Sequence, residues 1–287
     1  MQRLGRLLHM LSRDGVEHLG QRISFRRGSP GCSQSTRAAG GNRGEDVEKA
    51  IRSGIDVDTV GVVDTFTFRR SLAAEAIGTF ALVFVGGGAI MVDEESGGLG
   101  SVGIALAFGL VIMAMVYAVG HISGAHLNPA VTLVFSLRRH FPVARVPWYW
   151  AAQVTGALSA AVLLRISLGD VADVGATTPS GSQAQSFLWE VVLTAILLFV
   201  IMAVATDTRA VGEAAAIAIG GTIALASLVG GPISGASLTP ARSLGPAIAS
   251  GVGDSLWLYL VAPLVGGTLG ALAYEVVRGT KAAGEPA

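Results

Sequence analysis

One short motif occurs twice in this chain. The two copies are residues 122–130, ISGAHLNPA, and residues 233–241, ISGASLTPA, at a constant offset of 111 positions (239 − 128). In both copies a polar residue precedes Pro-Ala, and strongly apolar segments lie on either side. A duplicated break of this kind in apolar sequence predicts a membrane protein whose pore or binding site is built from two half-helices.

The composition supports a membrane protein. Of 287 residues, 51% are hydrophobic and only 14% are charged, whereas soluble domains carry about a quarter charged residues. The 39 glycines fit transmembrane helices, where glycine is frequent. A net charge of zero offers no basic field for nucleic acid. With no Cys/His cluster and no nucleophile–base–orienter set, we expect no metal, no cofactor and no enzyme activity, and a lipid bilayer as the partner.

The chain divides into three regions. Residues 1–68 are polar and rich in Arg, Gly and Ser, which predicts a mostly disordered extension. The first forty residues hold seven arginines against two acidic residues, so a targeting segment is an alternative. Residues 69–280 form the predicted channel domain, and 281–287 a short tail.

Six segments are long enough to span a bilayer, which takes about 20 apolar residues. They are residues 71–92, 100–120, 146–169, 186–206, 212–231 and 255–278. Two shorter apolar stretches, 129–137 and 240–250, directly follow the two motifs. The predicted fold is therefore all-α, with six transmembrane helices and two re-entrant half-helices.

The distribution of basic residues predicts the orientation. Positive residues mark the cytoplasmic side of a membrane protein, and here they alternate with uncharged or acidic loops: Arg69, Arg70, Arg138, Arg139, Arg145, Arg209, Arg278 and Lys281. Both termini are expected in the cytoplasm, at the plasma (inner) membrane. Glu75 and Glu190 begin equivalent spans in the two halves, so the halves form an inverted repeat. Arg165 and Arg242 do not fit the alternation.

The motif has a direct physical interpretation. Pro129 and Pro240 suit the first helical position, and Asn128 and Thr239 are expected to cap their helices by accepting a backbone N–H. Two helix N-termini, each carrying about half a positive charge, would repel cations and protons and pass neutral solutes. The preceding stretches, expected to be extended, offer a ladder of carbonyls: Gly124, Ala125, His126, Leu127, Gly235, Ser237 and Leu238.

Residues 70–280 resemble the aquaporin (major intrinsic protein) family. The resemblance rests on residues 123–132, SGAHLNPAVT, and 237–247, SLTPARSLGPA, which include Pro129-Ala130 and Pro240-Ala241. It implies a right-handed bundle of six helices plus two half-helices, a homotetramer with one pore per subunit, and passive conduction. The family's second motif usually begins with Asn. Thr239 instead offers one hydroxyl proton where Asn offers two N–H groups, so looser orientation of the permeant is expected.

The resemblance also implies roles for single residues. The family's selectivity filter corresponds to Phe108, Ser227, Ala236 and Arg242, and its loop-bracing glutamates correspond to Glu75 and Glu190. Water-selective members carry His at the Ser227 position, and glycerol-conducting members place a second aromatic near the filter. This chain has neither, so we expect a wider opening that passes water and small uncharged solutes: glycerol, urea, ammonia or metalloid hydroxides.

Other interpretations stay open from sequence alone. An alternative role for Arg242 is to neutralise a helix end. The alternative for Phe108 is a position facing lipid, and the alternative for Ser227 is a hydrogen bond to a neighbouring helix. The two glutamates are alternatively proton-relay carboxylates, and His126 either projects into the pore or anchors its loop. The alternative functions are a strict water channel, a coupled secondary transporter, and a non-conducting scaffold in which Thr239 spoils the pore.

Overall fold

The structure is a computed structural model that describes residues 57–206 and 214–279, with side chains from residue 65 onward. Within these ranges the ordered elements are all helical. The six long helices are α4 (Val57–Ser96), α5 (Gly100–Ser123), α7 (Val146–Leu168), α9 (Gln183–Thr206), α10 (Ala215–Ser234) and α12 (Leu256–Arg278). All six contain a stretch long and apolar enough to cross a membrane. The predicted all-α membrane fold is confirmed.

Four short elements complete the fold: α6 (Pro129–Leu137), η1 (Val143–Arg145), α8 (Ala172–Gly175) and α11 (Pro240–Ser250). At 1.5 Å per residue, α6 and α11 are about 14 and 17 Å long, roughly half the hydrocarbon thickness of a bilayer. Each begins at the proline of a motif copy. The half-helices predicted at 129–137 and 240–250 therefore have the expected bounds.

The first helix begins earlier than the hydropathy pattern indicates. α4 starts at Val57 and has 40 residues, about 60 Å, or twice what a bilayer needs. Residues 57–68, assigned from sequence to the extension, are thus the start of α4. The hydropathy pattern did not include them because it detects only the part of a helix that lies in lipid. The rest of that extension (1–56), the tail 281–287, Arg209 and Lys281 lie outside the described residues.

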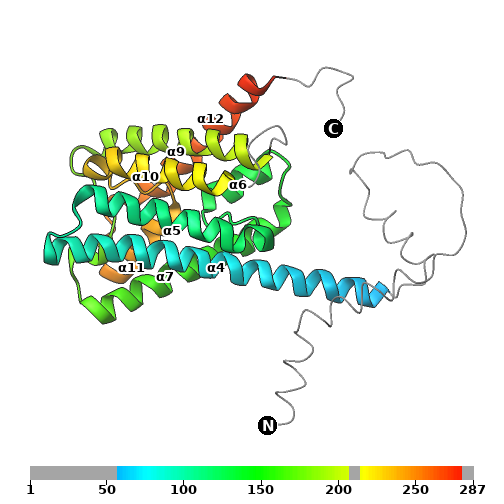
Figure 1. Ribbon diagram of the computed structural model, residues 1–287, viewed down its shortest axis with the longest axis horizontal. Coiled ribbons are helices and arrows are strands. Elements are labelled where there is room, and N and C mark those ends of the chain that lie inside the picture. The colour runs from blue at the N-terminus through cyan, green and yellow to red at the C-terminus, as the bar shows by residue number, and fades with distance from the viewer. Residues whose placement is uncertain (1–56, 207–213, 280–287) are drawn as a thin grey trace, which may run out of the picture. The chain divides into compact units, whose positions relative to one another are not determined.

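Close contacts between helix backbones depend on glycine. A Cβ at Gly156 on α7 would lie 2.1 Å from the carbonyl oxygen of Ala76 on α4. In the second half a Cβ at Gly266 on α12 would lie 2.2 Å from the carbonyl of Val191 on α9. The repeat therefore brings matching helices together by the small-residue packing typical of membranes. Figure 1 shows α9 and α10 running side by side, with α5 and α4 beneath them.

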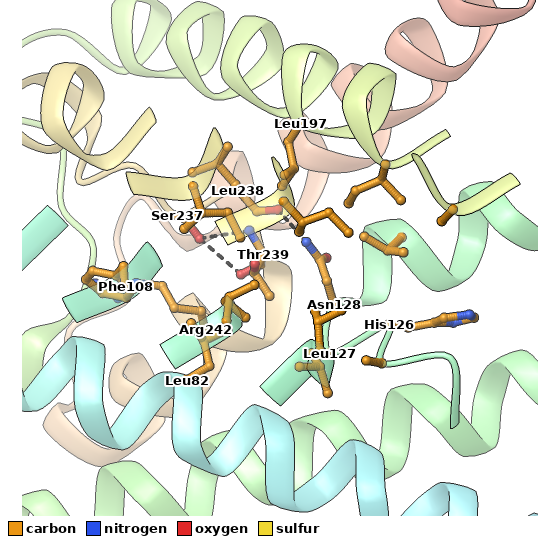
Figure 2. Close-up of a pocket in the computed structure, with 18 of the residues that line it drawn as sticks. Leu82, Phe108, His126, Leu127, Asn128, Leu197, Ser237, Leu238, Thr239 and Arg242 are labelled. Atoms are coloured by element: carbon orange, nitrogen blue, oxygen red, sulfur yellow. Dashed lines mark hydrogen bonds between the residues drawn. The ribbon is translucent and has the colours of Figure 1, made fainter. Parts of the chain in front are cut away.

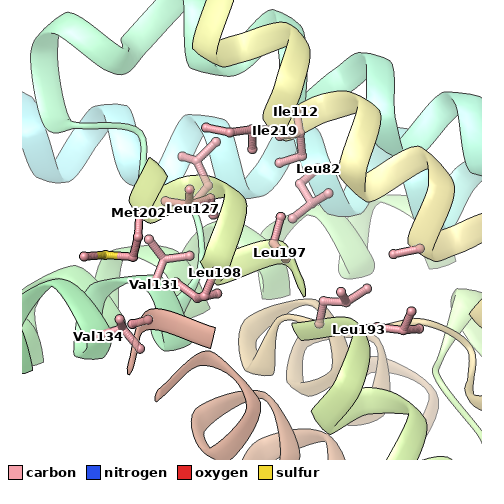
Figure 3. Packing of buried hydrophobic residues seen from close by; sticks show 14 of the residues in the cluster. Leu82, Ile112, Leu127, Val131, Val134, Leu193, Leu197, Leu198, Met202 and Ile219 are labelled. Atoms are coloured by element: carbon pink, nitrogen blue, oxygen red, sulfur yellow. The ribbon is translucent and has the colours of Figure 1, made fainter. Parts of the chain in front are cut away.

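Large apolar side chains form a cluster between the long helices (Figure 3). It joins Leu82 of α4, Ile112 of α5, Leu197 of α9 and Ile219 of α10. Other large apolar side chains lie exposed on the outer surface, among them Val102, Leu106 and Leu110 of α5. An apolar outer surface suits lipid rather than water.

Arg165, which did not fit the charge alternation, has a partner in the structure. Its guanidinium donates to the carbonyl oxygen of Ala249 near the end of α11, and it also pairs with Asp170 at 3.5 Å. A cation at the negative end of a helix dipole is favourable. The position of this arginine is therefore explained by the re-entrant helix rather than by the membrane orientation.

Candidate functional site

The loops before α6 and α11 share one backbone conformation. In the first loop φ is +86° at Gly124, +46° at Ala125 and +49° at Leu127. In the second, Gly235, Ala236 and Leu238 have φ of +81°, +42° and +52°. The expectation of extended stretches is therefore wrong. Left-handed φ at non-glycine residues costs of order 1–3 kcal/mol each, so the surrounding structure has to hold these loops in place.

Glu75 holds the first loop. Its Oε1 accepts hydrogen bonds from Ser123 Oγ at 2.7 Å and from His126 N at 2.9 Å. Its Oε2 accepts from Leu127 N at 2.7 Å and from Gln153 Nε2 at 2.8 Å. The carboxyl is completely buried, and four donors surround it.

Glu190 makes the matching contacts in the second half. Its Oε1 accepts from Ser234 Oγ and Ser237 N, each at 2.8 Å, and its Oε2 accepts from Leu238 N at 2.8 Å. The described residues supply no fourth donor. The position matching Gln153 is Pro263, at the offset of 110 that relates Tyr149 to Tyr259. Both tyrosines donate to the last helical carbonyl before their loop, Ser123 at 2.9 Å and Ser234 at 2.7 Å.

The two half-helices differ in their caps. Asn128 Oδ1 accepts from Ala130 N at 2.8 Å, and Asn128 Nδ2 donates to the carbonyl of Leu238 in the opposite loop at 2.8 Å. The Thr239 side chain makes no cap hydrogen bond. The prediction that Thr239 keeps the cap function is therefore wrong, because the shorter side chain does not turn back to its own helix. Pro129, Ala130, Pro240 and Ala241 are buried at the two helix starts.

The His126 ring packs into a group of aromatic rings. Its centroid lies 4.9 Å from those of Phe135 and Phe141 and 5.2 Å from that of Tyr149. Its Nδ1 is 3.1 Å from Thr132 Oγ1. Of the two interpretations left open for His126, the structure favours the one in which the ring anchors its loop.

A cavity of about 110 Å³ lies between the two motifs (Figure 2). One wall is apolar and includes Leu82, Ile112 and Leu197. The opposite wall is formed by the two loops, and the residues there that were predicted to supply carbonyls are Gly124, Ala125, His126, Leu127, Ser237 and Leu238. Gly235 lines a second cavity instead. Asn128 and Thr239 also border the first cavity, where Figure 2 shows them close together.

The four residues predicted for the filter all line this cavity: Phe108, Ser227, Ala236 and Arg242. A second cavity, of about 360 Å³, shares Phe108 and Ser227 with the first and extends to Asp93 at the far end of α4. The first cavity extends the other way, to Ala205 and Ala215. Phe108 and Ser227 therefore lie where two cavities from opposite ends of the bundle meet.

Arg242 has an unusual environment. It lies in the first turn of α11, where the helix dipole opposes a cation, and its side chain is buried. Its Nη1 donates to the carbonyl of Gly175 at 2.9 Å, and its Cζ lies 5.2 Å from the Phe108 ring centroid. Nε and Nη2 have no hydrogen-bond partner among the described residues. Buried donors without a partner are rare and call for an explanation. A permeating molecule that accepts hydrogen bonds from these two nitrogens is such an explanation.

Comparison with known proteins places the chain. The family model described as major intrinsic protein matches residues 62–274. The chain belongs to the major intrinsic protein family. It is 51% identical to Aquaporin NIP1-4 of Oryza sativa subsp. japonica, over 78% of this chain and 83% of the relative. It is 47% identical to Nodulin-26 of Glycine max, over 74% of this chain and 79% of the relative.

A solved structure of the family agrees with this fold. The aquaglyceroporin from Plasmodium falciparum has 29% identity and a TM-score of 0.64, covering 72% of this chain and 95% of that one. This major intrinsic protein is accordingly an integral membrane channel for water and small neutral solutes, and not an enzyme.

Several residues of the site were not found from the sequence. Gln153 bonds Glu75, Gly175 bonds Arg242, and Thr177 bonds α11 through Ser243. Gln153 carried one available signal, a polar residue inside an apolar span. Gly175 and Thr177 carried none, because they lie at the end of the short α8 and in the loop after it, and act through position rather than through a motif.

Proposed function

We propose that Phe108, Ser227, Ala236 and Arg242 form the selectivity filter, and that the channel conducts water together with small uncharged solutes: glycerol, urea, ammonia or metalloid hydroxides. The observation that carries this proposal is the shared cavity, which all four residues line and in which the two besides Arg242 and Phe108 are small. Serine and alanine leave room that a histidine or a second aromatic ring would fill. Arg242 offers Nε and Nη2, the two nitrogens that have no partner among the described residues, to a passing hydroxyl or carbonyl oxygen.

We propose that protons and ions are excluded at the centre. α6 and α11 both begin beside the central cavity, and Asn128 links their loops through its bond to the Leu238 carbonyl. Two positive helix ends and the guanidinium of Arg242 raise the energy of any cation there. The Glu75 and Glu190 carboxyls are engaged by the loops, which speaks against their use in proton coupling.

We propose a homotetramer in the plasma membrane with both termini in the cytoplasm. The basic residues beside the spans support the orientation: Arg70 lies over Phe66, Arg145 lies over Phe68, and Arg138 pairs with Glu275. The contact of Arg145 with Phe68 brings Arg145 to the part of α4 that carries Arg69 and Arg70, and such a gathering of positive charge is expected for a cytoplasmic face. The tetramer is proposed from the family resemblance and agrees with the wide apolar outer surface.

Light-scattering permeability of one proteoliposome preparation tests the proposal. Water, glycerol, urea and ammonia are each imposed as a gradient, and protein-free vesicles provide the baseline. Water flux together with glycerol or urea flux is expected. Water flux without any solute flux would identify a strict water channel. Absence of all flux would identify a scaffold, and uptake that follows membrane potential or a pH gradient would identify a transporter.

A further inference from the structure

A chain of hydroxyl groups, buried except at the half-buried Thr177, lies beside the second motif. Thr177 Oγ1 is 2.5 Å from Ser243 Oγ, and Ser243 Oγ is 2.6 Å from Ser237 Oγ. Ser237 Oγ donates in turn to the carbonyl of Thr239 at 3.0 Å. Ser243 is completely buried, and Ser237 and Thr239 are nearly so.

The direction of this chain follows from proton counting. Each hydroxyl has one proton to donate. Ser237 gives its proton to the Thr239 carbonyl, so Ser243 has to donate to Ser237, and Thr177 has to donate to Ser243. The bonds therefore run one way, from Thr177 to the carbonyl at the start of α11. Hydrogen bonds aligned in this manner polarise and strengthen one another.

The chain of hydroxyls ties the loop at residues 175–177 to α11, the half-helix that carries Arg242. Thr177 lies two residues after Gly175, whose carbonyl accepts from Arg242 Nη1 at 2.9 Å. Gly175 has φ of +67°, and a Cβ there would lie 2.9 Å from Gly87 on α4, so the loop rests directly on that helix. The loop is thus held against α4 on one side and against α11 on the other.

In the first half of the repeat, the position that matches Ser243 is held by a different set of contacts. Thr132, at the position matching Ser243, receives a bond from Gln153 Nε2 at 3.0 Å and contacts His126 at 3.1 Å. Since Pro263 replaces Gln153 in the second half, no amide is available there. Thr177 takes its place from the loop between α8 and α9, and this brings the Gly175 carbonyl to Arg242.

We propose that Thr177 and Ser243 are positioning residues for Arg242: their hydroxyls hold the loop so that the Gly175 carbonyl keeps the guanidinium to the side of the opening. The proposal rests on the filter assigned above. Arg242 Cζ already lies 5.2 Å from the Phe108 ring centroid, within cation–π range, so the ring and the Gly175 carbonyl are the two contacts that place the guanidinium. Without the carbonyl, the guanidinium is free to swing about the remaining contact into the opening. The opening then narrows, and larger solutes are slowed more than water.

The test uses the ratio of glycerol to water permeability in proteoliposomes of the full chain. Thr177→Val removes the hydroxyl and keeps the methyl that packs on Gly235, whereas Thr177→Ser keeps the hydroxyl. We expect Thr177→Val to lower the ratio of glycerol to water permeability about fivefold, because one hydrogen bond shifts the equilibrium that holds the loop by about that factor. Thr177→Ser should leave the ratio near wild type. Ser243→Ala should act as Val does. Thr155 Oγ1 donates to the carbonyl of Ala151 in its own helix, so Thr155→Val is the matched control for a threonine-to-valine substitution outside the site.

The background Arg242→Ala separates positioning from a general structural effect. There, Thr177→Val should no longer change the ratio, because the residue it positions is gone. An equal effect of Thr177→Val in both backgrounds, or wild-type ratios for both Thr177→Val and Ser243→Ala, overturns the proposal. If Arg242→Ala alone leaves the ratio unchanged, the filter assignment is wrong, and the proposal loses its basis with it.

Discussion

Replacing Thr239 with asparagine should make the two half-helices alike. Asn128 caps α6 through Ala130 N and reaches across to the Leu238 carbonyl, both at 2.8 Å. The Thr239 side chain makes no cap bond. By the internal repeat, an asparagine at 239 should accept from Ala241 N and donate to the carbonyl of Leu127.

The expected gain in stability can be estimated from these two bonds. A helix N-cap contributes about 1 kcal/mol, and a neutral hydrogen bond about 1 kcal/mol more. The sum, about 2 kcal/mol, corresponds to a rise in melting temperature of roughly 4–8 °C for a domain of this size. Melting of the detergent-solubilised protein measures it.

The same substitution should change conduction. Asparagine has one more heavy atom than threonine, and Thr239 borders the central cavity. The free hydroxyl is also lost from the centre. We expect glycerol permeability to fall about fivefold, as for a barrier raised by 1 kcal/mol, with a smaller change for water. Stopped-flow light scattering at matched protein content measures both.

Thr239→Val is the matched control, because it removes the hydroxyl without supplying a cap. Its melting temperature should not fall, since the hydroxyl does not cap α11. A clear fall would show that threonine does cap the helix. Unchanged melting and unchanged water and glycerol permeabilities in Thr239→Asn would refute the argument from asymmetry.

Three further changes test other parts of the site. Ser227→His should narrow the opening, lowering glycerol flux about tenfold while water flux stays near wild type; equal losses of both fluxes would contradict this. Glu190→Gln places an amide against the Leu238 N–H, and leaving one buried donor unpaired should cost about 1–3 kcal/mol in thermal stability, whereas the exposed Glu94→Gln should cost little. Burial lowers the pKa of His140 below 6.5, and the charges of Arg278 and Arg138 lower this pKa further, whereas the charge of Glu275 raises it. His140 therefore binds a proton more readily in the unfolded chain than in the folded protein. Stability should therefore drop as pH falls below about 6.5, and this drop should be smaller in His140→Gln, as melting curves at pH 7 and pH 5 can show.

Glu75 and Glu190 illustrate what local pattern could and could not reach. Their equivalent places in the two halves were visible, and the family resemblance pointed to loop bracing. Which atoms they meet depends on helices brought together from far apart in the chain, such as α7, which supplies Gln153 to Glu75. Spacing along one helix carries no information on that meeting.

The sequence by itself determined the membrane class, the six spans, the two half-helices and their common start at a proline, because apolar length and proline geometry act locally. It also indicated that Phe108, Ser227, Ala236 and Arg242 belong together, through the resemblance. Only the tertiary structure decided that Thr239 leaves α11 uncapped and that the loop at Gly175 and Thr177 meets Arg242. Those outcomes depend on side-chain reach and on packing between distant segments, and neither is written in the order of residues along one helix.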